Sequence, residues 1–333
     1  MHHFFKISTY FAYYSRTDKR PSYFHVFFLL PFFLRHPKIN IPLFKRFKRS
    51  NSLPNDSVLD DLAPPQISCL LVITRKDFVN LPDCVNGLVN GSKNPIAMFY
   101  FVTPSKYKAE CNTLVQGILP TSKYEIYSDE SIMPKNVMNR LREKFGSNFG
   151  WVLQQFLTVG FVMNSKDAGI LAIDGDTVLL RPQIWLTNEG KQTLMVSSEY
   201  HSAYYELLSK IDSKFSSVTY SFITHHMLFQ PVIMRSILAK IGVDKIDDLA
   251  DLIFRNVDSN RTSPLCIEFE IYAQSMLLHF PDKISLTRFS NIPVALPEEN
   301  DLRFRKIEYL KSKSRYNSIS AHTWIPTNNQ NEN

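Results

Sequence analysis

The sequence predicts an α/β fold in which a mixed, mainly parallel sheet is flanked by helices and preceded by an N-terminal arm. One observation is three apolar runs of strand length, at 67–74, 96–103 and 168–174. Uninterrupted apolar runs are typical of strands covered on both faces. The other observation is that helix-like segments lie between these runs, an alternation that builds parallel sheets. With 333 residues, 44% of them hydrophobic, the chain can bury one large core or two moderate ones.

The predicted elements follow one another at the spacing of right-handed crossovers. Each assignment combines apolar periodicity with the polar, Pro or Gly residues that separate the segments. In chain order we expect a strand at 67–74, a helix at 81–92, a strand at 96–103, a helix from Pro104 to about Leu114, a strand at 124–127, helices at 137–146 and 149–165, and a strand at 168–174.

Two carboxylates, Asp174 and Asp176, interrupt the apolar stretch "LAIDGDTVLLRP" at 171–182. Asp174 is expected at the carboxyl end of the fourth strand, where open α/β sheets bind their ligands. Side chains at i and i+2 of an extended segment lie on one side, so both carboxylates can converge on a hard cation such as Mn²⁺ or Mg²⁺. Gly175 leaves room for a ligand beside the backbone. An Asp-Gly turn between two strands is the alternative interpretation.

Residues 1–50 form an arm whose composition differs from the rest of the chain. They hold ten Lys/Arg, one Asp and 14 of the 43 aromatic residues. The apolar run at 23–34 is about 12 residues long, against the roughly 20 needed to cross a bilayer, and Pro31 interrupts it. Aromatic and basic residues together suit the headgroup region of an anionic membrane, so we expect peripheral membrane contact. The alternatives are a poorly ordered extension or an uncleaved targeting segment.

Beyond the arm, 28 basic residues face 30 acidic ones, so the body carries a net charge of −2. This balance argues against a nucleic-acid partner. Residues 51–66, rich in Ser, Asn, Asp and Pro, are a predicted linker. We assign residues 67–325 to the functional domain and 326–333 to a polar tail.

Two further absences narrow the function. The Gly-rich fingerprints of dinucleotide-binding and P-loop proteins do not occur. The cysteines show no metal-binding spacing and are expected to be buried free thiols, which fits a reducing compartment. They are Cys69, Cys84, Cys111 and Cys266.

Five segments place polar groups in an apolar frame, which is typical of residues that line a pocket. They are "GWVLQQF" at 150–156, "LAIDGDTVLLRP", "EYHSAYY" at 199–205, "SFITHHM" at 221–227 and "EFEIY" at 268–272. In this order they resemble an uncharacterised family of glycosyltransferase-like proteins with a domain of unknown function. More distantly, the chain resembles lipopolysaccharide-type sugar transferases of the GT-A fold. Thr158 and Ile267 depart from that pattern, where the family usually has Lys and Ser.

The resemblance covers roughly residues 67–325 and implies a GT-A-like, Rossmann-like domain. It implies that Asp174 and Asp176 hold Mn²⁺ or Mg²⁺ on the diphosphate of a nucleotide-sugar donor. By the same resemblance, the segment with Thr74, Arg75 and Asp77 contacts the nucleoside. His322 is a candidate third metal ligand, because many GT-A proteins take one from near the C-terminus; a surface histidine is the alternative.

Helical geometry limits the donor contacts of the "GWVLQQF" segment. Gln154 and Gln155 are neighbours on a helix, so only one of them can face the site fully. Trp151 can stack on a ring, although an indole belongs more often to the core. All three are expected donor-binding residues.

Substrate contacts are expected from Glu199, Tyr200 and His201, with Glu199 and His201 on one side of an extended stretch. His225 and His226 are neighbours on a strand and face opposite sides, so one of them is expected to be a core histidine. Each of the two is a substrate-binding candidate, because a neutral imidazole can ligate metal or move a proton near neutral pH.

Three carboxylates are candidates for a catalytic base. An inverting transfer needs one carboxylate to deprotonate the acceptor hydroxyl. Glu268 and Glu270 are slightly favoured over Glu199. They fall in a helix-like run that separates them around the axis, and only an extended start would turn both toward the site.

The sequence therefore predicts a metal-dependent glycosyltransferase that moves a sugar from a nucleotide-sugar to a hydroxyl of a glycan or glycolipid. A metal-dependent phosphoesterase and a non-catalytic carbohydrate-binding protein of transferase fold are the alternatives. We expect the protein in the cytoplasm or on the cytoplasmic face of a membrane, with the Golgi lumen as another location.

Overall fold

The computed structural model describes residues 63–197, 202–217, 221–257, 267–297, 299–313 and 316–321. The strands are β1 (Ile67–Val72), β2 (Ile96–Thr103), β3 (Tyr124–Ser128), β4 (Ile170–Ile173), β5 (Thr177–Leu179), β6 (Gln192–Val196), β7 (His226–Phe229), β8 (Ile284–Arg288), β9 (Asn291–Pro293) and β10 (Ser318–Ser320). The helices are α4 (Leu81–Gly91), α5 (Lys108–Gln116), α6 (Asp129–Ile132), α7 (Lys135–Phe145), α8 (Phe149–Asn164), α9 (Ser202–Ile211), α10 (Pro231–Lys240), α11 (Ile246–Asn256), α12 (Glu268–His279) and α13 (Asn300–Lys313).

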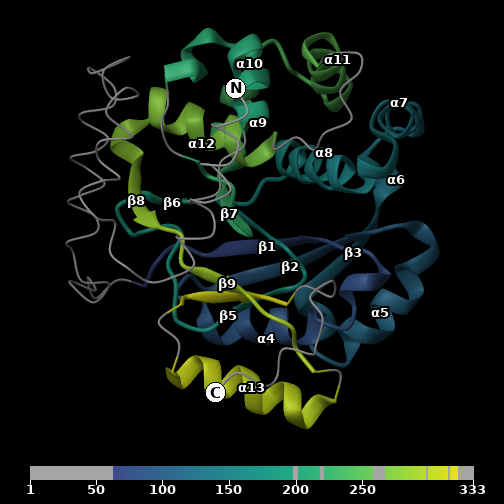
Figure 1. Cartoon of the computed structure of the whole chain (residues 1–333), viewed down its shortest axis with the longest axis vertical. Coiled ribbons are helices and arrows are strands. Elements are labelled where there is room, and N and C mark those ends of the chain that lie inside the picture. The colour runs from purple at the N-terminus through teal and green to yellow at the C-terminus, as the bar shows by residue number, and fades with distance from the viewer. Residues whose placement is uncertain are drawn as a thin grey trace, which may run out of the picture.

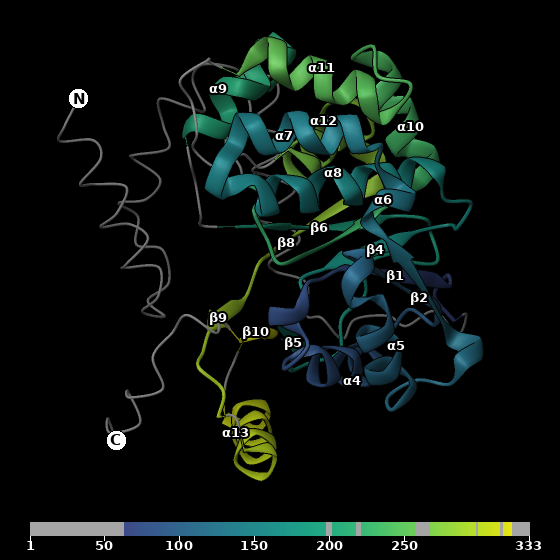
Figure 2. The ribbon, with the colours of Figure 1, turned by 90° about the vertical axis from the view of Figure 1, so that its right-hand side faces the viewer.

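A five-stranded sheet in the order β3-β2-β1-β4-β7 forms the centre of the molecule. The strands from β3 to β4 run parallel, and β7 pairs antiparallel with β4 at the edge. Helices cover both faces, with α4 and α5 on one side and α7 to α12 on the other (Figures 1 and 2). The predicted α/β class, with a mixed and mainly parallel sheet flanked by helices, is confirmed.

Alternate residues of the central strands enter two different cores. In β1, Leu70 packs into the core beneath α7 to α12, whereas Cys69 and Leu71 pack into the core with α4 and α5. In β4, Ala172 packs into the core beneath α7 to α12, and Ile173 packs into the core with α4 and α5. Because both faces are buried, the strands need apolar residues at every position, which explains the continuous runs in the sequence.

Two smaller sheets extend the fold beyond β4 and β7. The first has the order β5-β10-β9, and the second pairs β6 with β8 in parallel. β5 follows β4 after only three residues, yet it pairs antiparallel with β10 rather than with β4. The chain therefore leaves the central sheet at residues 174–176.

The expected elements match the observed ones closely. The predicted helix from Pro104 is a short 3-10 turn at Ser105–Tyr107 that continues into α5. Among the described residues, no helix combines the length and the apolar composition needed to cross a bilayer. The predicted arm, most of the linker and the polar tail lie outside the described residues.

Candidate active site

Residues 174–176 form a turn that is held from three directions. The Asp174 N–H donates to the His225 carbonyl at 2.9 Å, and the Thr177 N–H donates back to the Asp174 carbonyl at 2.9 Å. On the far side, the Ala321 N–H at the end of β10 donates to the Asp176 carbonyl at 2.7 Å. The Asp-Gly turn therefore exists, but it links two different sheets instead of closing a hairpin. Turn and ligand site are compatible interpretations of this segment.

Gly175 sits against the end of β1 with no room for a side chain. A Cβ built there would lie 2.7 Å from Ile73 Cγ2 and 3.3 Å from Asp77 Cβ. Real Cβ atoms almost never approach a heavy atom so closely. This contact lets the turn pack closely on the end of β1 and places the flanking carboxylates beside the segment that follows β1.

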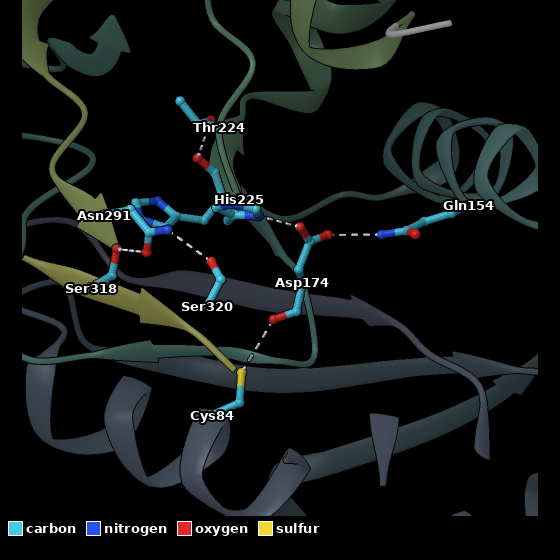
Figure 3. A network of polar contacts seen from close by, with 9 residues as sticks. Cys84, Gln154, Asp174, Thr224, His225, Asn291, Ser318 and Ser320 are labelled. Carbon is cyan, nitrogen blue, oxygen red and sulfur yellow. Dashed lines mark hydrogen bonds and ion pairs between the residues drawn. The ribbon is translucent and has the colours of Figure 1, made fainter. Parts of the chain in front are cut away.

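The Asp174 carboxylate is aimed by two neighbours, one from the helical layer and one from the edge strand (Figure 3). Gln154 Nε2 on α8 donates to Asp174 Oδ1 at 2.9 Å. His225 Nδ1 lies 3.0 Å from Asp174 Oδ2. The Asp174 side chain keeps 34% of its surface exposed and His225 keeps 26%, so both remain accessible to a ligand.

The segment after β1 supplies another carboxylate at the same edge of the sheet. Asp77 Oδ2 accepts the Thr74 N–H at 2.8 Å and the Thr74 hydroxyl at 3.1 Å, which closes a tight turn. Burial raises the Asp77 pKa, and the charge of Asp176 raises it further. Arg75 instead pairs with Glu110 at 3.1 Å on the surface. Of the expected nucleoside contacts, Thr74 and Asp77 lie beside the turn.

Helix α8 divides its neighbouring glutamines between site and core. Gln154 reaches Asp174, whereas Gln155 is 2% exposed and its Oε1 accepts the Ile267 N–H at 2.6 Å. Gln155 thus anchors the start of α12, and its expected donor contact is not supported by this placement. Trp151, one turn before Gln154, is 38% exposed and packs on Tyr204.

The two neighbouring histidines also face opposite sides, as the alternation of side chains along a strand requires. His226 is buried, and its Nδ1 accepts the Trp185 indole N–H at 3.2 Å. Burial lowers the His226 pKa to about 3, so the ring stays neutral. His225 is the histidine at Asp174, and His226 is the core histidine. The expected substrate contact of His226 is not supported by this placement, because the ring is enclosed.

Glu270 is a structural carboxylate at the first turn of α12. Its Oε1 accepts the Phe222 N–H at 2.7 Å, the Tyr205 hydroxyl at 2.9 Å and the Ser221 hydroxyl at 3.3 Å. Its Oε2 accepts Gln274 Nε2 at 2.7 Å. These contacts tie α12 to neighbouring segments and occupy the carboxylate. Because both oxygens accept hydrogen bonds, this placement does not support Glu270, one of the two favoured candidates, as a base.

Glu268, two residues earlier, differs from Glu270 in its hydrogen bonds. It is 9% exposed, and its Oε2 accepts no hydrogen bond from the described residues. Burial raises the Glu268 pKa to about 8; nearby helix amides lower it, and the charge of Asp174 raises it. Glu268 is thus a buried, proton-holding group in the first turn of α12.

Some contacts around the turn have no local signal in the sequence. Asn80, next to α4, donates to the Ala321 carbonyl at 2.9 Å across 241 positions of sequence. Cys84 Sγ lies 3.7 Å from the Asp174 carbonyl, beneath the turn. Asn291 joins Ser318 and Ser320 nearby (Figure 3). The pairing of β10 with β5 and β9 brings Asn291, Ser318, Ser320 and Ala321 together near the turn.

Four predicted site residues lie outside the described residues: Glu199, Tyr200, His201 and His322. Within the described ranges, no three His, Cys, Asp or Glu residues form a group that would hold a metal by themselves. His322 follows Ala321 directly in the sequence. The carboxylates within the turn itself are those of Asp174 and Asp176, on either side of Gly175.

Comparison with known proteins finds a likeness in structure only. No family model and no curated protein matches the chain. Mouse xyloside xylosyltransferase 1, in its apo form, is 12% identical with a TM-score of 0.44, over 78% of this chain and 99% of its own. The galactosyltransferase LgtC, in complex with donor and acceptor sugar analogues, is 9% identical with a TM-score of 0.46, over 76% and 86%. Both describe a distant likeness of chain path, and neither carries residue roles to this chain.

We expect Gly175→Ala to destabilise the protein by about 1–3 kcal/mol, because the new methyl group overlaps Ile73. Gly150→Ala is the matched control, since nothing lies within 4 Å of its Cβ position and alanine favours a helix. Urea unfolding of both variants measures the difference. Equal stability of the Gly175 variant and the wild type would show that the turn is loosely packed.

We expect opposite effects from Glu268→Gln and Glu270→Gln. The folded protein keeps the Glu268 proton that the unfolded chain releases between pH 4.5 and 8, so the native carboxyl loses stability as the pH rises across that window. Glu268→Gln should therefore raise the melting temperature at pH 8 and change it little near pH 4.5. Glu270→Gln turns an amide toward hydrogen-bond donors and should cost about 2–4 kcal/mol.

Thermal melts of the two variants and the wild type, recorded from pH 4.5 to pH 8, measure these effects. Glu270 serves as the matched control, because it is a buried carboxylate on the same turn of the same helix. A Glu268→Gln protein that is less stable than the wild type at pH 8 would mean that the native carboxylate is satisfied when charged.

Proposed function

We propose that this protein is a metal-dependent glycosyltransferase that moves a sugar from a nucleotide-sugar donor to a hydroxyl of a glycan or glycolipid. One observation carries the proposal: two carboxylates flank the close-packed Gly175 at the carboxyl end of a parallel strand. Open α/β sheets bind their ligands at this edge. The order of the five polar segments in the sequence supports the same activity.

The donor set fits a hard divalent cation. Mg²⁺ is usually bound by one or two carboxylates together with substrate phosphates, so it does not need a cage made of protein alone. Asp174 and Asp176 would hold Mn²⁺ or Mg²⁺ here, and His322 is the proposed third ligand. The cation supplies positive charge that stabilises a departing nucleoside diphosphate.

The neighbours of Asp174 would orient its carboxylate. Gln154 and His225 each contact one oxygen, which limits rotation of the side chain. Residues that hold a ligating group in this way typically affect metal affinity and activity by 10–100-fold. Thr74 and Asp77, with Trp151 on α8, are proposed to contact the donor.

Glu268 is the best-placed described candidate for the base that takes the acceptor proton in an inverting transfer. With a pKa of about 8, it binds a proton more strongly than an ordinary carboxylate and is mainly protonated at neutral pH, so activity as a base should increase as the pH rises through 8. The occupied oxygens of Glu270 remove the nearest competitor. Glu199 stays a second candidate.

The burial of His226 weakens the phosphoesterase alternative. That chemistry would draw on His201, His225 and His226 around two metal ions, and the enclosed His226 ring contacts Trp185 instead. A non-catalytic carbohydrate-binding protein would bind the donor without transferring its sugar or hydrolysing it. Activity assays distinguish it from a transferase.

We also propose that the arm at 1–50 contacts an anionic membrane, on the cytoplasmic face. Its excess of basic and aromatic residues supports this contact. A membrane-linked glycan or glycolipid is then the favoured acceptor.

Replacement of the turn carboxylates tests the proposed activity. Asp174→Asn and Asp176→Asn should each lower sugar transfer and donor hydrolysis by at least roughly 100-fold, because several kcal/mol of charge stabilisation depends on the cation. The stabilisation that UDP-, GDP- or CMP-sugars give with Mn²⁺ should also disappear from thermal melts. Asp301→Asn, an exposed carboxylate on α13, is the control.

Glu268→Gln separates chemistry from binding. It should lower kcat strongly while the thermal shift produced by donor and Mn²⁺ remains. Full activity of Asp174→Asn and Asp176→Asn proteins in EDTA would defeat the metal-dependent mechanism, and unchanged kcat in Glu268→Gln would remove the proposed base alone.

A further inference from the structure

Helix α13 stands at one end of the molecule, below α4 in both views (Figures 1 and 2). Three of the seven large exposed hydrophobic side chains in the described part of the chain belong to it. Leu302 is 48% exposed, Phe304 65% and Tyr309 62%. Arg303 and Ile307 are the buried residues of the helix. The helix thus contacts the body along a narrow line and leaves two flanks open.

One flank combines apolar and basic side chains in a single row. At 100° per residue, Leu302, Arg305, Tyr309 and Lys313 fall within about 80° of one another. We call these four residues the α13 stripe. Phe304 and Lys311 lie on the other flank, across the buried line. The stripe has the i, i+3, i+7, i+11 spacing of an amphipathic helix face.

The bases of the stripe are free to bind a partner. Within the described residues, Arg305 and Lys313 form no ion pair and no hydrogen bond to a side chain. On the other flank, Lys311 Nζ is 2.7 Å from Glu308 Oε1, so its charge is already compensated. Positive charge that lacks a local partner is therefore concentrated on the stripe.

We propose that the α13 stripe binds the surface of an anionic membrane. Lipid phosphates and carboxylates complement Arg305 and Lys313, while Leu302 and Tyr309 enter the boundary between headgroups and acyl chains. A nucleic acid would use the bases but offers no apolar layer for the leucine. The basic arm at 1–50 is repelled by the same charges, so it is a poor cover for the stripe.

The proposed contact does not depend on the chemistry at Asp174. It adds a surface on the folded body to the contact proposed for residues 1–50. The arm is present in every variant of the full chain, so differences between variants report α13 alone.

Co-sedimentation of the full chain tests the proposal, with vesicles of phosphatidylcholine alone and of phosphatidylcholine mixed with phosphatidylserine. The ionic strength is set so that half of the wild type sediments with the mixed vesicles. The pair Tyr309→Ser/Lys313→Gln should lower the partition constant at least five-fold, since each base near an anionic surface contributes about that factor. Arg305→Gln/Lys313→Gln should lower it roughly 30-fold.

The matched control is Phe304→Ser/Lys311→Gln, which removes one aromatic and one lysine of similar exposure from the same helix. It should change the partition constant less than about two-fold, because screening weakens charges that face away from the surface. Unchanged melting temperatures show that all variants fold.

Three results with vesicles would overturn the proposal. They are an equal loss in the stripe and control pairs, no loss in the stripe pairs, and equal binding to both kinds of vesicle. Stripe-dependent binding of duplex DNA without binding of vesicles would assign the stripe to a nucleic acid and would also overturn it.

Discussion

The contact between Gly175 and the end of β1 is the constraint on which the site depends. With no side chain at 175, the turn packs directly on Ile73 and Asp77. Hydrogen bonds from two sheets then hold the backbone on either side of the glycine, through His225 and Ala321. The carboxylates are thus presented by a backbone that is fixed before any ligand arrives. Such preorganisation reduces the free energy that binding must spend on ordering the site.

The two glutamates of α12 differ in role: Glu270 stabilises the packing of the helix, and Glu268 is the proposed catalytic base. Glu270 is buried, but its oxygens accept four hydrogen bonds that stabilise the packing of the helix. Burial raises the pKa of both glutamates, but Glu268 has an oxygen, Oε2, that accepts no hydrogen bond from the described residues, so its ionisation costs stability. A fold gains nothing from such a group unless it is used, and perturbed carboxyls cluster at functional sites. The charge of Asp174 contributes to the raised Glu268 pKa, which supports a functional role over a structural one.

Local patterns predicted the central strands and the division of neighbouring residues between site and core. Strand alternation separates His225 from His226, and helix geometry separates Gln154 from Gln155, although neither rule says which member faces the site. The choice between Glu268 and Glu270 could not be made, because it depends on donors from Phe222, Tyr205 and Ser221, which lie far from α12 in the sequence. The pairing of β5 with β10 escaped prediction for the same reason: strands of three residues carry little periodicity, and their partners lie far away in the sequence.

A continuous set of hydrogen bonds connects α13 to the turn. Arg303, on the buried line of α13, donates to Asp83 and to Asn80 on the α4 side. Asn80 donates to the Ala321 carbonyl, and the Ala321 N–H donates to the Asp176 carbonyl. The helix with the proposed membrane stripe and the carboxylate with the proposed cation therefore share one anchored strand end. A membrane bound along α13 would fix the direction in which the turn faces relative to the lipid, as transfer to a membrane-linked acceptor requires.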